Sequence, residues 1–200
     1  MSVDFNGQAF SHFMEQKVKK CLEVLRKGGT ILYPTDTIWG IGCDATNKTS
    51  VDKIYRIKKR PETKSLIILV DDKEMLKTYV KSIPDIAWDL ISNVERPLTI
   101  IYPGVQNLPV NLVGEDDSIA IRIVRNDFCR MLIHEFRKPI VSSSANISGE
   151  NSPLIFKEIS KEILESVDYV VNLYQDQIQE MRPSTIIKLF ENGEFHIIRS

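Results

Sequence analysis

The chain has 200 residues, of which 42% are hydrophobic, so it is long enough to bury one well-packed core. Its 26 basic and 27 acidic residues nearly cancel, and a net charge of -1 excludes a whole-molecule attraction to nucleic acid or to membranes. Any basic site must therefore be local. We expect a single domain over residues 1–200, with its motif-bearing core at about residues 28–199.

The cysteines and the apolar runs predict a cytoplasmic protein without a membrane partner. Cys21, Cys43 and Cys129 lie far apart and lack CxxC spacing, which argues against a disulfide framework and a zinc knuckle. The first ten residues do not join a basic segment to an apolar core, and runs such as residues 66–70 are too short to span a bilayer. Reduced thiols in the cytoplasm are the simplest interpretation.

Helical and strand-like hydrophobic spacing alternate along the chain. In chain order, the first half is predicted to form a helix at residues 10–25, strands at 30–33 and 38–43, a helix from 50 and a strand at 66–70. The second half is predicted to form helices at 72–79 and 84–90, strands at 98–102 and 118–123, a helix at 126–136, a strand at 140–141, a helix at 155–163, a strand at 169–173 and a hairpin turn at 191–194. This alternation indicates an α/β fold, and the terminal hairpin favours a mixed sheet.

Local residues set the expected ends of several helices. The pair Gly28-Gly29 can stop the first helix, because glycine readily adopts the left-handed conformation. Ser50 can cap the second helix, and Pro61 forbids its continuation. Asp72 can cap the third helix, and Asn126 or Asp127 can cap the helix that follows residues 118–123.

Polar residues adjoin predicted strands or helix ends at four places. Taken alone, Pro34-Thr35-Asp36-Thr37 is most simply a turn, and the basic run at residues 55–64 is most simply a solvated helix end. The serine-rich segment 141–152 fits a surface loop and an anion site about equally well, and residues 182–185 fit a turn that starts a strand. Their recurrence in one α/β chain favours a site for a polar, multiply anionic ligand.

Four of these stretches, ILYPTDTIWGIGCDA, KKRP, SSANISG and PSTII, occur in this order. Together they resemble the YrdC-like L-threonylcarbamoyladenylate synthase family, in its single-domain, bacterial type. The resemblance runs from about Gly28 to Arg199, and the Lys-x-Arg and Ser-x-Asn pairs are both intact. It implies an open, twisted, mixed parallel and antiparallel sheet with flanking helices. It also implies a nucleotidyltransferase that joins L-threonine, bicarbonate and ATP into threonylcarbamoyl-AMP and pyrophosphate, for threonylcarbamoyl-adenosine modification of tRNA.

The resemblance also implies roles for individual residues. The residues implied to bind threonine are Thr37, Arg122, Ser144 and Ser184. The residues implied to bind ATP are Lys58, Arg60, Lys64, Ser118, Asn146 and Arg199, and Lys58 and Arg60 are also implied to be catalytic. The reaction needs two anions brought together and charge neutralised on the leaving pyrophosphate, without a nucleophilic side chain. We expect Mg²⁺ to arrive with ATP and expect no separate metal site in the protein.

Two alternatives remain at this stage. The local cluster Lys53, Arg56, Lys58, Lys59 and Arg60 could bind tRNA or double-stranded RNA in a ribosome-associated YrdC/YciO-like protein without synthase activity. A carbamoyl transfer to a different acceptor would use the same nucleotide chemistry. The synthase reading further implies separate tRNA-modification proteins downstream.

Overall fold

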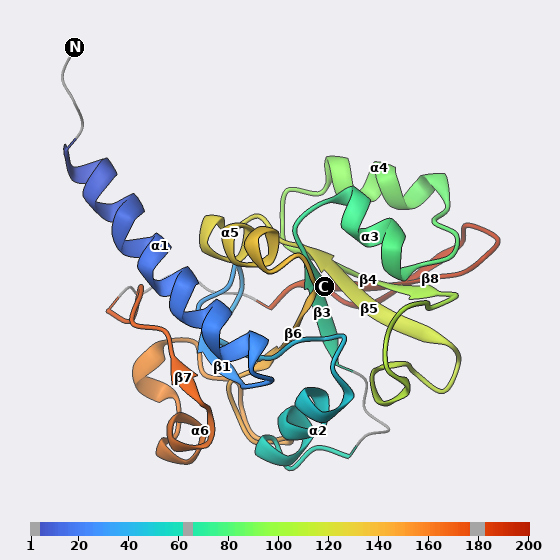
Figure 1. Cartoon of the computed structure of the whole chain (residues 1–200). Coiled ribbons are helices and arrows are strands. Elements are labelled where there is room, and N and C mark those ends of the chain that lie inside the picture. Colours follow the sequence, from blue (N-terminus) through green and yellow to red (C-terminus); the bar gives the residue numbers. More distant parts are fainter. Residues whose placement is uncertain (1–4, 62–65, 177–182) are drawn as a thin grey trace.

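The computed structural model describes residues 5–61, 66–176 and 183–200, and its helices pack against both faces of one sheet (Figure 1). The strands are β1 (Ile31–Tyr33), β2 (Gly40–Gly42), β3 (Ile67–Val70), β4 (Leu98–Pro103), β5 (Ser118–Ile123), β6 (Ile140–Ser144), β7 (Tyr169–Val170), β8 (Thr185–Leu189) and β9 (Phe195–Arg199). Their order across the sheet is β7-β1-β2-β6-β3-β5-β4-β8-β9.

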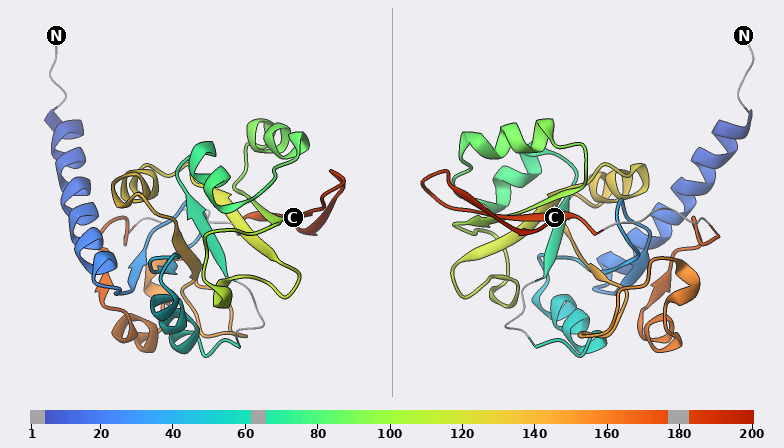
Figure 2. Two further views of the ribbon diagram at one scale, coloured as in Figure 1. Left: turned by 45° about the vertical axis from the view of Figure 1, so that its right-hand side comes forward. Right: turned by 180° about the vertical axis from the view of Figure 1, so that it is seen from behind.

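The sheet is mixed, as the sequence predicts. The parallel pairs are β1 with β7, β3 with β5 and β4 with β8. The other neighbours, including the terminal hairpin of β8 and β9, run antiparallel. Figure 2 shows β8 and β9 extending from the end of the sheet that lies away from the first helix. The predicted α/β class is therefore confirmed.

The helices are α1 (Phe5–Arg26), α2 (Lys48–Ile57), α3 (Lys73–Tyr79), α4 (Asp85–Asn93), α5 (Asp127–Phe136) and α6 (Lys161–Ser166), with short 3₁₀ helices η1 (Val110–Leu112) and η2 (Phe156–Glu158). Several predicted ends are confirmed. Gly28 adopts φ +73° after α1, Asp72 caps α3, Asn126 caps α5, and Gly193 adopts φ +84° in the hairpin turn. Within residues 5–61, 66–176 and 183–200, no helix has the length and apolarity needed to cross a membrane.

Other predicted ends are wrong for local physical reasons. Asn47 rather than Ser50 caps α2, since its side chain accepts the Ser50 N–H at 3.1 Å while the Ser50 hydroxyl donates to the carbonyl of Gly28. The helix ends at Ile57, before Pro61, because the next residues turn and Lys59 adopts φ +48°. The predicted helix at 155–163 divides into η2 and α6, because Ser160 starts a new helix by accepting the Ile163 N–H.

Two hydrophobic cores lie on opposite faces of the sheet. The first packs α2, α3 and α4 against side chains such as Ile68 of β3 and Ile121 of β5. The second packs α1 and α5 against Ile31, Leu69 and Ile140, which belong to β1, β3 and β6. Burying these side chains contributes roughly 25 cal/mol per Å² of apolar surface removed from water. Among the described residues, this second core includes no side chain of β4 or β8, so part of the second face stays open.

Candidate functional site

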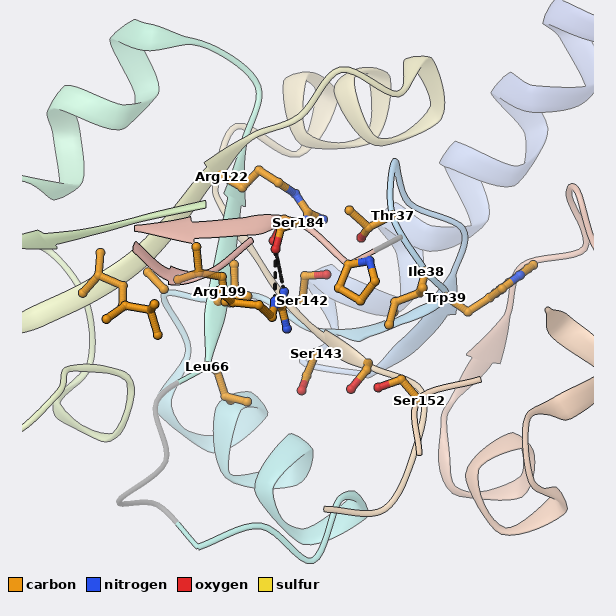
Figure 3. Close-up of a pocket in the computed structure, with 18 of the residues that line it drawn as sticks. Thr37, Ile38, Trp39, Leu66, Arg122, Ser142, Ser143, Ser152, Ser184 and Arg199 are labelled. Atoms are coloured by element: carbon orange, nitrogen blue, oxygen red, sulfur yellow. Dashed lines mark hydrogen bonds between the residues drawn. The ribbon is translucent and has the colours of Figure 1, made fainter. Parts of the chain in front are cut away.

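A cavity of about 310 Å³ occupies the open part of the second sheet face (Figure 3). It is lined from β2, β3, β4, β5, β6, β8 and β9, with contributions from the loop after β1. Strand alternation explains which side chains reach it. In β5, Ile119 and Ile121 enter the first core, so Ala120 and Arg122 face the cavity. The cavity thus draws together residues from distant parts of the chain.

The loop between β1 and β2 holds Thr37 at the cavity by a closed set of hydrogen bonds. The Thr35 hydroxyl donates to the carbonyl of Ile38 at 2.8 Å and accepts the Thr37 N–H at 3.1 Å. The two threonine hydroxyl oxygens lie 3.0 Å apart. Thr35 is 2% exposed and absent from the cavity lining, whereas Thr37 belongs to it. Thr35 therefore shapes the turn, and Thr37 presents a hydroxyl to the cavity.

Arg122 brings a buried cation into the cavity wall. Its side chain is 4% exposed, and its Nη2 lies 3.0 Å from Oδ1 of Asp36, whose side chain is 9% exposed. Figure 3 shows the guanidinium pointing from β5 toward Thr37 and Ser184. A guanidinium suits a carboxylate or phosphate, since its planar donors can bind two oxygens at once.

Ser184 and Arg199 form the side of the cavity made by the terminal hairpin. The Arg199 guanidinium donates to the carbonyl of Ser184, at 2.8 Å from Nη2 and 3.1 Å from Nε. The Ser184 hydroxyl lies 2.8 Å from the buried hydroxyl of Thr99. Burial, and secondarily the charge of Arg122, lowers the pKa of Arg199. Two cations beside one cavity favour an anionic occupant.

Lys58 has a different environment from Arg60, although only one residue separates them in the sequence. Arg60 lines the cavity, and burial lowers its pKa. Lys58 is 1% exposed, and its ammonium donates to the carbonyls of Ser144 and Asn146, the latter at 2.6 Å. Burial, and then the charge of Arg60, lowers the pKa of Lys58 to about 8. Lys58 therefore joins the end of α2 to the segment that carries the Ser-x-Asn pair.

The structure brings six of the proposed site residues together as cavity lining: Thr37, Arg60, Arg122, Ser144, Ser184 and Arg199. Three others lie outside the lining. Lys58 is buried as described, the Asn146 amide donates to the carbonyls of Ile147 and Glu150, and the Ser118 hydroxyl donates to Asp116 at 2.5 Å. Lys64 lies outside the described residues. The individual ligand assignments stay predictions.

Sequence reasoning did not name several lining residues as site residues, namely Trp39 and, within the segment 141–152 that it singled out, Ser142, Ser143 and Ser152. The serine run at 142–144 gave the signal for two of them, because β6 continues to Ser144 instead of stopping at residue 141. Trp39 is 1% exposed, and its ring centroid lies 4.8 Å from that of Phe156. No periodicity distinguishes such an aromatic from an ordinary core residue.

Metal-binding side chains do not gather among the described residues. In the ranges 5–61, 66–176 and 183–200, no group of three or more His, Cys, Asp or Glu side chains is arranged to hold a metal ion. Asp36, which lies beside the cavity, is engaged with Arg122. A protein-built cage for a resident ion therefore does not fit these residues, whereas a metal carried by a bound phosphate needs no such cage.

Comparisons with known proteins place these observations in a family. The Sua5/YciO/YrdC family model, described as "Telomere recombination", matches residues 23–200. A threonylcarbamoyl-AMP synthase from Pseudoalteromonas translucida (strain TAC 125) is 35% identical over 161 residues, which cover 79% of this chain and 86% of that protein.

Solved structures give the same fold. Sua5 from P. abyssi, complexed with L-threonine, superposes with a TM-score of 0.80 at 28% identity over 88% of this chain and 51% of that one. This chain thus spans about half the length of that Sua5. YciO from E. coli superposes with a TM-score of 0.77 at 24% identity, over 92% of this chain and 88% of that one. At this identity the likeness to YciO concerns the fold alone.

Proposed function

Since the chain belongs to the Sua5/YciO/YrdC family, we propose that it is a threonylcarbamoyl-AMP synthase. It joins L-threonine, bicarbonate and ATP, releases pyrophosphate, and supplies the adenylate to tRNA-modification proteins in the cytoplasm. The observation that carries the proposal is the cavity itself, where Arg60, Arg122 and Arg199 meet the hydroxyls of Thr37 and Ser184. This set of donors suits two anionic substrates held side by side.

The cavity has two parts, one that binds threonine and one that binds the phosphates of ATP. We assign the carboxylate of threonine to Arg122, and the remaining polar groups of threonine to the hydroxyls of Thr37, Ser144 and Ser184. Arg60 and Arg199 face the phosphates of ATP. The backbone of Ser144 is held in place, because its carbonyl accepts a hydrogen bond from the ammonium of Lys58. Asn146 is held in the same way, so Lys58 orients the segment that completes the site.

The chemical step requires orientation and charge neutralisation. The amine of threonine and bicarbonate first condense with loss of water, so that a C–N bond forms and a C–O bond breaks, giving the carbamate. A carbamate oxygen then attacks the α-phosphorus of ATP, a new P–O bond forms, and the P–O bond to pyrophosphate breaks. Positioning the two reactants in one cavity lowers the entropic part of the barrier. Fixed cations near the phosphates stabilise the charge that accumulates on the leaving group. Mg²⁺ enters as part of the MgATP substrate.

The RNA-binding alternative receives less support from the side chains of its basic cluster. Lys53 donates to the carbonyl of Gly28 at 2.8 Å, Lys58 is buried, and Lys59 pairs with Glu162 at 2.7 Å. Arg56 also donates to the carbonyl of Asp52, at 3.4 Å. A phosphate-binding surface would instead leave the donors of these cations available to phosphate oxygens. A carbamoyl transfer to another acceptor differs from the synthase reaction in its substrates, and a comparison of carbamoyl phosphate with bicarbonate and threonine distinguishes the two.

The test is threonine-dependent release of pyrophosphate. Purified protein is incubated with MgATP, radiolabelled bicarbonate and L-threonine, and pyrophosphate and labelled adenylate are measured. We expect both products, and we expect Arg122→Ala to reduce them at least tenfold, because about 2 kcal/mol is a typical value of a charge-assisted hydrogen bond. Arg130→Ala, at an exposed position of α5, is the matched control.

Two results would contradict the proposal. One is pyrophosphate release that does not depend on threonine. The other is an adenylate that forms with carbamoyl phosphate but not with bicarbonate and threonine, which identifies the alternative carbamoyl transfer.

A further inference from the structure

Asp36 carries a buried carboxylate beside the cavity that the proposed reaction leaves without a role. It sits between Thr35 and Thr37, whose hydroxyls take part in hydrogen bonds within the loop. Its Oδ1 lies 3.0 Å from Nη2 of Arg122, and its Oδ2 accepts the N–H of Arg125 at 3.4 Å. Asp36 therefore ties this loop to β5 and to Arg125, two residues after the end of that strand.

The Arg122 guanidinium has donors left over after this contact. Nη2 faces Asp36, while Nε is buried and makes no hydrogen bond to another described residue. An arginine offers five N–H donors in one plane, so a single carboxylate does not exhaust them. Buried donors normally find partners, and an unused one at a cavity wall is a place for a ligand oxygen.

The contact between Asp36 and Arg122 is an ion pair without aligned hydrogen-bond geometry at Oδ1. Its attraction is therefore mainly electrostatic, and burial of both side chains makes it stronger than a surface pair. Arg125 anchors the other end, since its guanidinium donates to the carbonyls of Val94 and Glu95, each at 2.6 Å. Asp36 thus has a rigid support on the β5 side.

From these contacts we propose that Asp36 is a positioning residue for Arg122, holding the guanidinium so that its remaining donors meet the carboxylate of threonine. This inference rests on the proposed function, because it assigns threonine to Arg122. Asp36 does not contact the substrate. It restricts a side chain with four rotatable bonds to one arrangement before the substrate arrives, which favours productive binding.

The test compares Asp36→Asn with Asp44→Asn. Asparagine keeps the shape of Asp36 and removes its charge. Asp44 is the matched control, because its buried carboxylate also pairs with a cation, Lys138 at 2.8 Å, and it is absent from the cavity lining. We expect Asp36→Asn to raise KM for threonine about tenfold while KM for ATP changes less than about twofold. Asp44→Asn should leave both KM values unchanged, although its melting temperature falls.

A second measurement does not depend on substrate. The Arg122 Nε–H signal in a ¹H–¹⁵N NMR spectrum, assigned by its loss in Arg122→Lys, should exchange slowly with water in the parent protein and quickly in Asp36→Asn. Unchanged exchange overturns the positioning role. An equal rise of both KM values, or a fall of KM for threonine, also overturns it, the latter because it would mean that Asp36 competes with the substrate.

The outcomes separate the inference from the proposed function. If the parent protein releases no threonine-dependent pyrophosphate, the proposed function is wrong and the assignment of threonine to Arg122 falls with it. If the parent protein is active and Asp36→Asn matches it in KM for threonine, only the role of Asp36 is wrong.

Discussion

Lys58 places an ammonium group where almost no water reaches it. Its side chain is 1% exposed and donates to the carbonyls of Ser144 and Asn146. Burial lowers its pKa to about 8, whereas the unfolded chain keeps the proton up to about pH 10.4. Between these values the unfolded state binds more protons, so this lysine makes the free energy of unfolding rise with pH.

Removal of Lys58 should therefore change the pH dependence of stability. From pH 7.5 to 9.5, we expect the parent protein to gain about 2 kcal/mol of unfolding free energy relative to Lys58→Met, by proton linkage. Urea unfolding of both proteins at several pH values measures the difference. A difference that stays constant with pH would show that the Lys58 pKa is not lowered in the folded protein.

Arg199 differs from Lys58 because it is partly exposed and reaches the cavity. We expect Arg199→Gln to raise KM for ATP by about tenfold and to lower stability by less than about 1 kcal/mol, since solvent screens an exposed cation. Steady-state kinetics and thermal unfolding measure the two effects. Ile197→Thr, at a 64% exposed position of the same strand, is the control and should leave KM for ATP unchanged. A loss of stability without a change in KM for ATP would show that Arg199 stabilises the hairpin and does not bind ATP.

At the scale of elements, β2 is a short strand whose three residues include two glycines. A Cβ on Gly42 would overlap the carbonyl of Val141 and lie 2.7 Å from Cε1 of Tyr33. A Cβ on Gly40 would lie 3.1 Å from the Ser142 hydroxyl and 3.2 Å from Cγ2 of Thr35. A methyl group at residue 42 would therefore collide with backbone. A methyl group at residue 40 would contact only the ends of side chains.

The two glycines should therefore respond differently to alanine. Gly42→Ala should destabilise the fold by about 3 kcal/mol or more, because the strands on each side cannot separate without losing their pairing. Gly40→Ala should fold with a loss of about 1 kcal/mol or less and raise KM for threonine, since the added methyl group narrows the cavity. Thermal unfolding and kinetics check both variants, and equal stabilities would contradict the packing at Gly42.

Most elements could be predicted from sequence, because their signals are local. The predicted strand at residues 118–123 coincides with β5, and Asp72 and Asn126 cap the helices that they were expected to cap. Errors arose where two local signals competed. Asn47 and Ser50 are both good caps, and only the three-dimensional contact of Ser50 with Gly28 decides between them. The predicted strand at residues 169–173 is longer than β7, because among the described residues after Val170 only the Val171 N–H continues the pairing, by donating to the carbonyl of Leu32 at 2.9 Å.

At the scale of the whole molecule, the cavity depends on which part of the sheet the helices leave uncovered. The motifs could be identified from sequence, but their relative placement could not, because the order β6-β3-β5-β4-β8 is not the chain order. This order brings Ser144, Arg122 and Ser184 to one face. The surroundings of Lys58 could not be predicted for the same reason, since its ammonium donates to carbonyls 86 and 88 residues away.

A ligand in this cavity would connect segments from the first loop to the last strand. We therefore expect L-threonine and α,β-methylene-ATP, which cannot release pyrophosphate, to stabilise the protein against thermal unfolding. At 100 times the dissociation constant, each ligand should add about 2.7 kcal/mol, or roughly 5–10 °C for a chain of this size. Bound threonine should also strengthen nucleotide binding by the same factor that nucleotide strengthens threonine binding.

The matched variants make this prediction specific. Arg122→Ala should lose the threonine-dependent shift and keep the nucleotide-dependent one, and Arg60→Ala should show the reverse, because the two cations are assigned to different substrates. Differential scanning fluorimetry with each ligand alone and with both measures the shifts. Loss of both shifts in each variant, without loss of folding, would mean that the cavity holds one undivided anion site. The division into a threonine side and a nucleotide side would then be wrong.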